Sequence, residues 1–367
     1  MVGSYLAKCM NVEYKLKEAK KTIEKCVGKN GFYASHDSYY GEYWIRDLIY
    51  SMKTLLNLGY KNLVKKNLIF FLENQKESGE IPFKITNINI PSFLYSIFNF
   101  IRRPRTPFFS TPPKLFYPFI PDSTILTIIG IYEYSKLCND NEILQTYEKK
   151  IIKALDFLKK KANKKFNFII GADWRDAMEN YKNKYVFCNQ ILFFKMYQLI
   201  GEDRKAEKIK ENINNIFWKE ELGHYIDYIG GENHIDVLGH ALALIYDVPY
   251  KKYFEKIIKS IKKASTKFGY RNLWPPYKEE ICNQKINSYQ NSSIWPFIHG
   301  FVIIAFKKIG LKEEAEKEFI KFTNLKGFNE WYSPIDGRPS GSMYQLWSAA
   351  LYLQAYEILK NKNNIYY

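Results

Sequence analysis

Residues 171–181 hold the densest group of side chains that could carry out chemistry. They read GADWRDAMENY, in which Asp173 and Asp176 flank Trp174 and Arg175. Carboxylates beside an indole ring suit carbohydrate chemistry, because the ring stacks on a sugar face and apolar surroundings raise a carboxyl pKa. The same residues also fit an ordinary helix start, with Asp173 as the N-cap and Asp176 in the first turn. The stretch alone leaves both interpretations open.

A second polar group lies in the segment YYGEYWIRD. Arg46 and Asp47 come two and three residues after Trp44, near the start of an apolar helical pattern. A fixed Arg–Asp pair can bind two neighbouring sugar hydroxyls, one as donor and one as acceptor. The alternative is a helix-start ion pair of little energetic value. Asp122 begins another apolar pattern, and by itself it fits an ordinary N-cap.

Two further segments repeat this combination near the C-terminus. NSYQNSSIWPFIHGF carries Tyr289, Asn291 and Trp295, and KGFNEWYSPIDGRP carries Glu330 and Trp331. Independent N-caps would explain the acidic residues at these places, but they would not explain a tryptophan beside each of them. A sugar-binding cleft formed by several loops explains both.

The composition excludes several classes of protein. The 367 residues are 46% hydrophobic and 17% aromatic, enough for a large core, and the net charge is +17. The lysines are spread over helical faces rather than gathered in one stripe, and no recognition motif is present, so we expect no nucleic-acid partner. We expect carbohydrate as the partner instead.

The cysteines and the apolar runs predict the compartment. Five cysteines lie far apart and are odd in number, which argues against a disulfide framework or a CxxC metal site. No signal peptide is recognisable, and no apolar run reaches the roughly 18 residues of a spanning helix. We therefore expect a cytoplasmic protein with no stable membrane insertion, no metal and no cofactor.

Helical periodicity predicts an all-α fold. We expect about twelve helices, at residues 9–27, 44–58, 61–75, 123–137, 142–161, 187–200, 203–217, 235–246, 251–266, 292–309, 312–324 and 342–360. Apolar patterns alternate with Lys/Glu-rich ones. Short connections follow the apolar helices, and long aromatic-rich connections lead back to the next apolar helix.

This alternation indicates six helical hairpins closing into a ring, with all long loops on one rim. An open solenoid is the alternative, but no fixed sequence repeat supports it. We expect one domain over residues 1–367, with residues 78–122 as a long Pro/Phe-rich insertion. Within it, residues 91–103 predict a short helix with a basic end that covers the cavity as a lid, or lies on a membrane surface.

Several of these segments resemble the six-hairpin glycoside hydrolases. The resemblance rests on WIRD, on PDS at an apolar helix start, on NQ-I-LFF after DWRDA, on YQNSSIWP and on EWYSPIDGRPSG followed by YQLWSAA. It covers roughly residues 40–358 and is closest to the neutral/alkaline invertases. Glucoamylases and the amylo-1,6-glucosidases of glycogen debranching enzymes are more distant.

The resemblance implies an (α/α)6 barrel and an inverting mechanism. Asp176 matches the general acid, with Asp173 as the alternative within a small alignment shift, and Glu330 matches the general base. An inverting pair needs carboxyl groups about 6.5–9.5 Å apart, which two loops of one rim can provide. The expected substrate-binding residues are Trp44, Arg46, Asp47, Asp122, Trp174, Arg175, Gln190, Tyr289, Asn291, Trp295, Trp331 and Gln345.

The sequence also bears on the substrate and on two alternative functions. The invertase segment DRRMG, part of sucrose recognition there, is not reproduced, so we expect an α-glucosidic oligosaccharide or disaccharide. A sugar epimerase on the same barrel would need two histidines in the cavity, to be drawn from His224, His234, His240 and His299. A non-catalytic carbohydrate-binding protein would keep only the aromatic residues.

Overall fold

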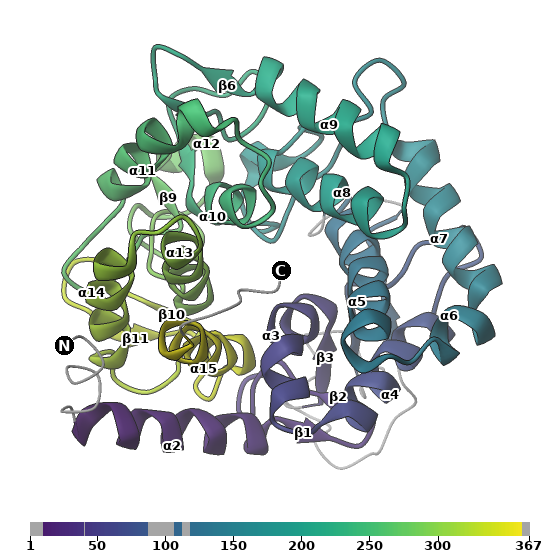
Figure 1. Cartoon of the computed structure of the whole chain (residues 1–367), viewed down its shortest axis with the longest axis horizontal. Helices are drawn as coiled ribbons and strands as arrows, with labels where there is room; N and C mark the ends of the chain where they lie inside the picture. Colours follow the sequence, from purple (N-terminus) through teal and green to yellow (C-terminus); the bar gives the residue numbers. More distant parts are fainter. Residues whose placement is uncertain (1–9, 40, 87–105, 112–117, 362–367) are drawn as a thin grey trace.

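The computed structural model describes residues 10–39, 41–86, 106–111 and 118–361, and within them the chain is mostly helical, as predicted. Six helices form an inner ring (Figure 1). They are α3 (Ile45–Asn57), α5 (Asp122–Cys138), α8 (Phe187–Leu199), α10 (Val237–Ile245), α13 (Pro296–Lys308) and α15 (Leu346–Lys360). Each packs against the next, and α15 closes the ring by packing against α3.

Six longer helices of the described chain surround this ring, and each packs on an inner partner (Figure 1). They are α2 (Met10–Lys25), α4 (Lys61–Glu73), α7 (Glu148–Lys161), α9 (Asp203–Ile216), α11 (Phe254–Lys263) and α14 (Lys312–Thr323). The first of them, α2, packs on the last inner helix, α15, so the two ends of the described chain meet. None of the helices in the described segments is both long and apolar enough to span a membrane.

The sequence patterns explain which helices lie inside. Every residue of α10 is buried, because the inner helices contact neighbours on all sides. In α11 only Ile257, Ser260 and Ile261 are buried, and its lysines face outward. A single apolar stripe is what an outer helix needs, and each fully buried aliphatic side chain contributes about 1.5–3 kcal/mol.

Several predicted helix boundaries are wrong by a few residues or more. The helix expected at 142–161 divides at Tyr147 into α6 (Glu142–Thr146) and α7. α10 begins later than expected because Asp236 caps it, accepting a hydrogen bond from the Gly239 amide at 3.0 Å. α13 begins at Pro296, whose fixed φ suits the first helical position. The residues before these helix starts belong to loops or, for Ile235–Asp236, to a short strand.

The all-α prediction missed short strands. They form five small antiparallel sheets in the described residues: β1 (Val27–Gly28) with β2 (Gly31–Phe32), β3 (Glu42–Trp44) with β4 (Lys84–Thr86) and β5 (Thr106–Phe108), β6 (Trp218–Lys219) with β7 (His224–Tyr225), β8 (Ile235–Asp236) with β9 (Leu273–Trp274), and β10 (Trp331–Tyr332) with β11 (Pro339–Ser340). All lie in connections that lead from an outer to an inner helix. Segments of two or three residues carry no alternation that a sequence could display.

The long insertion is only partly described. Its two ends enter the sheet of β3, β4 and β5, which anchors it next to the start of α3. The lid helix expected at residues 91–103 lies outside the described residues. The opposite rim has short turns, three of which place a glycine (Gly59, Gly201, Gly310) at φ of +89°, +77° and +90°. Left-handed backbone suits glycine, so these turns end the inner helices tightly.

Candidate active site

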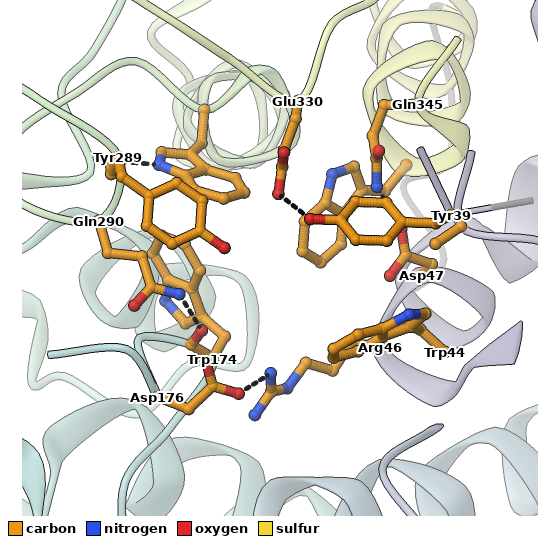
Figure 2. A pocket seen from close by; sticks show the side chains of 13 residues that line it. Tyr39, Trp44, Arg46, Asp47, Trp174, Asp176, Tyr289, Gln290, Glu330 and Gln345 are labelled. Atoms are coloured by element: carbon orange, nitrogen blue, oxygen red, sulfur yellow. Dashed lines mark hydrogen bonds and ion pairs between the residues drawn. The ribbon is translucent and has the colours of Figure 1, made fainter. Parts of the chain in front are cut away.

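A pocket opens where the inner helices begin (Figure 2). Nine of the predicted site residues line it: Trp44, Arg46, Asp47, Trp174, Asp176, Tyr289, Trp295, Glu330 and Gln345. Ala34, Tyr39, Gln290 and Trp347 also line it and were not predicted. These residues come from long loops or from the first turns of α3 and α15, as expected for loops that converge on one rim.

Arg46 connects two acidic residues at one side of the pocket. Its Nη1 donates to Asp176 Oδ2 at 2.8 Å, while Nε and Nη2 donate to the two oxygens of Asp122 at 2.8 and 3.1 Å. Asp122 does not line the pocket but lies buried behind Arg46. Burial raises the pKa of Asp122 to about 6, and the charge of Arg46 limits the rise. The bidentate pair fixes the guanidinium plane that faces Asp176.

Glu330 faces the pocket from a different side (Figure 2). The Tyr39 hydroxyl donates to Glu330 Oε1 at 3.2 Å, and the Ser342 amide donates to Oε2 at 3.2 Å. Burial raises the pKa of Glu330 above its usual range, and both hydrogen bonds oppose that shift. The carboxyl group is therefore held in one orientation in a largely dry environment.

A third buried acid lies close to Glu330. Asp47, at the start of α3, accepts a hydrogen bond from Gln345 Nε2 at 2.7 Å. Burial raises the pKa of Asp47 well above its usual range, and the charge of Glu330 raises it further. A protonated carboxyl can donate as well as accept, so Asp47 can bind a hydroxyl group in either sense.

Gln290 positions the segment that carries Asp176. Its Nε2 donates to the Trp174 carbonyl at 2.8 Å, and its Oε1 accepts from the Ala177 amide at 3.0 Å. No helix begins at this segment, which runs as a loop until a single 3-10 turn at Glu179–Tyr181. The helix-start interpretation of Asp173 and Asp176 is therefore wrong. Both carboxylates are held by side chains of other residues.

Arg175 and Asp173 lie behind the pocket rather than in it. Arg175 is fully buried, and its Nη2 bridges Asp173, Asp227 and Asp236 at 2.6, 2.9 and 3.2 Å. The Tyr181 hydroxyl also donates to Asp227, at 2.5 Å. Burial raises the pKa of Asp236 to about 7 against the attraction of Arg175. We therefore correct both assignments: these residues anchor the loop from behind.

Three other predicted substrate-binding residues do not line the pocket: Gln190, Asn291 and Trp331. The amide of Gln190 bonds the backbone of Ile169 and Val186, and that of Asn291 bonds the backbone of Tyr277 and Gln284. Both side chains are buried, so they serve loop packing rather than substrate contact. Trp331 is partly buried beside the pocket residue Tyr289, with 6.4 Å between ring centroids.

The histidines do not line the pocket. His240 Nε2 accepts from the Tyr225 amide at 3.2 Å, and His299 Nδ1 accepts from the Tyr270 amide at 3.3 Å. Each ring places its other nitrogen on a backbone carbonyl, so both are neutral structural histidines. His224 and His234 also bond backbone carbonyls. The epimerase alternative lacks the pair of cavity histidines that it requires.

One cluster in the described part of the chain has metal-ligand spacing. Potential ligand atoms of Asp173, Cys188 and Asp236 lie within 4.8 Å of one another. Both carboxylates already bind Arg175, and burial raises the pKa of the Cys188 thiol well above its usual range. A guanidinium occupies the place where a cation would be needed, so these residues do not fit a metal.

The unpredicted pocket residues carried weak sequence signals. Gln290 and Trp347 stand inside the segments YQNSSIWP and YQLWSAA, next to residues that were predicted. Tyr39 precedes β3 in a stretch with no periodicity, and it reaches Glu330 across 291 positions of the chain. Only the closed ring brings these two residues together.

No family model matches the chain. One curated relative is mannosylglycerate hydrolase from Rubrobacter radiotolerans, which is 26% identical over 160 residues. The match covers 41% of this chain and 36% of that protein, so it spans about a third of the relative's length.

Solved structures match over most of the chain. The GH63 mannosylglycerate hydrolase from Thermus thermophilus, in complex with glucose, has a TM-score of 0.68 at 12% identity and covers 92% of this chain and 99% of its own. The rhamnosidase from Klebsiella oxytoca with rhamnose bound has a TM-score of 0.69 at 13% identity, with 95% and 64% covered. At these identities the comparison establishes the architecture, and the chain shares the fold of glycosidases.

Proposed function

We propose that this protein is an inverting glycoside hydrolase, with Asp176 as the general acid and Glu330 as the general base. The observation that carries the proposal is the pocket itself, in which carboxylates from two separate loops face a cavity lined by four tryptophans. Asp173, the alternative acid, binds Arg175 and does not line the pocket, which supports Asp176 for this role. The ring of helices supports the narrower inference of an (α/α)6 barrel of the six-hairpin type, forming one catalytic domain.

The reaction follows from these two roles. Glu330 removes a proton from a water molecule, whose oxygen bonds the anomeric carbon as the glycosidic carbon–oxygen bond breaks. Asp176 gives its proton to the departing oxygen. Arg46 and Asp47 supply a donor and an acceptor for the hydroxyls of the sugar ring. Because water attacks opposite the leaving group, the product has the inverted configuration.

The surroundings of Asp176 and Glu330 bear on which of them is the acid and which is the base. Arg46 Nη1 lies 2.8 Å from Asp176 Oδ2, and burial raises the pKa of Glu330 above its usual range. A raised pKa also suits a general acid, so the alternative assignment exchanges the two roles. The sequence resemblance favours Asp176 as the acid. A substrate whose leaving group needs no protonation distinguishes between the two assignments.

For the substrate we propose a small α-glucoside. The relatives add mannosylglycerate to the panel to be tested, because the Rubrobacter and Thermus proteins are mannosylglycerate hydrolases. The panel is therefore sucrose, trehalose, maltose, isomaltose, a limit dextrin, mannosylglycerate and glucosylglycerate, with the product anomer read by NMR. Hydrolysis with inversion of one of these supports the proposal, and release of the retained anomer contradicts it.

Matched variants test the two carboxylates. We expect Asp176→Asn and Glu330→Gln each to lower kcat by about 10²–10⁴-fold. Asp336→Asn, an exposed carboxylate near Glu330 in the β10–β11 hairpin, should keep wild-type activity. Equal activity in all four proteins would overturn the assignment.

A glycosyl fluoride then distinguishes acid from base, because fluoride leaves without protonation. The acid variant should regain most activity on this substrate, whereas the base variant should not. If Glu330→Gln rather than Asp176→Asn regains activity, the roles are exchanged. If the intact protein binds sugars but hydrolyses none of the panel, the carbohydrate-binding alternative replaces the hydrolase.

A further inference from the structure

Residues 35–39, ahead of β3, form a turn that carries one of the hydrogen-bond donors to Glu330. This donor is the hydroxyl of Tyr39, which bonds Glu330 Oε1 (Figure 2). The Tyr39 amide donates to Ser35 Oγ at 3.0 Å, and the Ser35 hydroxyl donates in turn to Asp37 Oδ1 at 3.1 Å. The side chain of Asp37 is therefore connected, through Ser35, to the backbone of Tyr39.

Asp37 also binds the segment on the other side of Glu330. Its Oδ2 accepts a hydrogen bond from the Met343 amide at 2.9 Å, across 306 positions of the chain. The residue before Met343 is Ser342, whose amide donates to Glu330 Oε2 at 3.2 Å. A single carboxylate thus connects the two segments that donate to the two oxygens of Glu330.

A simpler explanation is that Asp37 only closes its own turn, as aspartates in turns commonly do. The contact with Ser35 fits that explanation. The contact with Met343 does not, because that amide comes from the connection between β11 and α15. Nor is Asp37 needed to hold the two segments together, since their backbones already form a bridge between Ser35 and Gln345.

Asp37 therefore acts beyond that bridge, where Tyr39 and Ser342 reach Glu330. It is half-buried and does not line the pocket. Any effect on the reaction must pass through these neighbours. Because the backbone bridge remains without it, we expect a variant that lacks the Asp37 side chain to fold, with the Tyr39 hydroxyl and the Ser342 amide held less firmly.

We propose that Asp37 is a positioning residue for the general base, because it holds the groups that fix the orientation of the Glu330 carboxylate. The inference rests on the proposed function, in which Glu330 removes a proton from water. Proton removal requires the base within hydrogen-bond distance of that water. A displacement of about 1 Å can cost about 10²-fold in rate.

The competing explanation is that Asp37 acts on Glu330 only through its charge. Asp37 is one of the groups that, after burial, raise the pKa of Glu330. A charge effect does not require the Tyr39 hydroxyl, whereas a positioning effect acts in part through it. The two explanations therefore differ in how the effects of changing Asp37 and Tyr39 combine.

A double-mutant cycle between Asp37 and Tyr39 tests the proposal, with kcat and KM measured on the substrate that the panel identifies. We expect Asp37→Ala to lower kcat by about tenfold or more at unchanged KM. In the Tyr39→Phe background the same change should lower kcat by less than about threefold, because the hydroxyl that Asp37 positions is absent. Asp156→Ala, an exposed aspartate on α7, is the matched control and should keep wild-type kcat.

Wild-type kcat in Asp37→Ala would overturn the inference, as would effects that multiply independently of Tyr39. Urea unfolding shows whether each variant folds. If Asp37→Ala does not, Asp37→Asn replaces it in the cycle, since one amide oxygen then takes the place of two carboxylate oxygens. An inactive Glu330→Gln beside a fully active Asp37→Ala contradicts this inference alone, whereas an active Glu330→Gln contradicts the proposed function.

Discussion

Arg46 is the residue on which most of the pocket geometry depends. It holds Asp176 on one side and the buried Asp122 on the other. Replacing it with alanine would leave the carboxyl group of Asp122 buried without its partner. We expect Arg46→Ala to lower the free energy of unfolding by about 3 kcal/mol as well as to weaken substrate binding.

Urea unfolding measures this loss in the free energy of unfolding directly. Arg338→Ala removes an exposed arginine whose partner is a surface aspartate and should change stability by less than about 0.5 kcal/mol. Arg46→Lys keeps a charge but not the bidentate geometry, so an intermediate loss is expected. Wild-type stability in Arg46→Ala would show that Asp122 does not depend on this pair.

Tyr39 controls the ionisation of Glu330 in the same local manner. Its hydroxyl donates to the carboxylate and so lowers the pKa of Glu330 against the effect of burial. Removing it in Tyr39→Phe raises that pKa. With Glu330 as the base, the acidic limb of the kcat/KM profile moves to higher pH, because the carboxylate then forms later in the titration.

The profile should be recorded for the wild type, Tyr39→Phe and the exposed control Tyr14→Phe. Only Tyr39→Phe should shift. A limb that stays in place would indicate either that Glu330 is not the group that titrates or that its hydrogen bond to Tyr39 is absent in solution.

At the scale of elements, the short hairpins at the rim position the side chains of the pocket. β10 and β11 bring Gly341 against Glu330, with φ of +69°. A Cβ at this glycine would collide with Glu330 Oε2, and its own backbone would be strained. We expect Gly341→Ala to reduce kcat at least tenfold by moving the carboxylate.

Gly310→Ala provides the control for backbone strain. Gly310 has φ of +90°, and nothing lies within 4 Å of the position of its Cβ. Both substitutions should cost about 1–2 kcal/mol of stability, measured by thermal unfolding, but only Gly341→Ala should lose activity. Parallel losses of activity would show that strain alone is responsible.

The same elements show how far local patterns could predict the fold. The inner and outer helices were predicted because each has a period of 3.6 residues with one or several apolar faces. The strands were missed because two residues have no period. The starts of α10, α13 and α15 were placed two to four residues too early, since serines such as Ser292 and Ser342 also suit a helix start.

At the scale of the whole molecule, ring closure buries histidines that cannot take up protons. Burial lowers the pKa of His240 and of His299 to about 3, against an ordinary value of 6.5. Between these values the unfolded chain binds more protons than the folded one, so these histidines make stability fall as the pH falls from 6.5 to 3. The raised pKa values of Asp122 and Asp236 act in the opposite direction.

Comparing how stability changes with pH in the wild type and in a variant isolates the contribution of one histidine. We expect the loss of stability between pH 7 and pH 5, measured by urea unfolding, to be smaller in His299→Gln than in the wild type. The exposed His36→Gln should keep the wild-type slope. An unchanged slope in His299→Gln would mean that this ring is protonated in the folded state.

The sequence by itself determined the local properties of this protein: which segments are helical, which helices are apolar on all sides, and where acidic and aromatic residues stand together before an inner helix. Periodicity and residue type act over a few turns, so they can be read without knowledge of the fold. They were sufficient to identify Asp176, Glu330, Arg46 and Asp47 as pocket candidates.

Only the tertiary structure decided which neighbours in the sequence share an environment. Asp173 and Asp176 are three residues apart, yet one binds the buried Arg175 and the other faces the pocket. Tyr39 meets Glu330 because six inner helices close into a ring. Side-chain direction in a loop depends on partners that arrive from distant segments, and no local pattern records those partners.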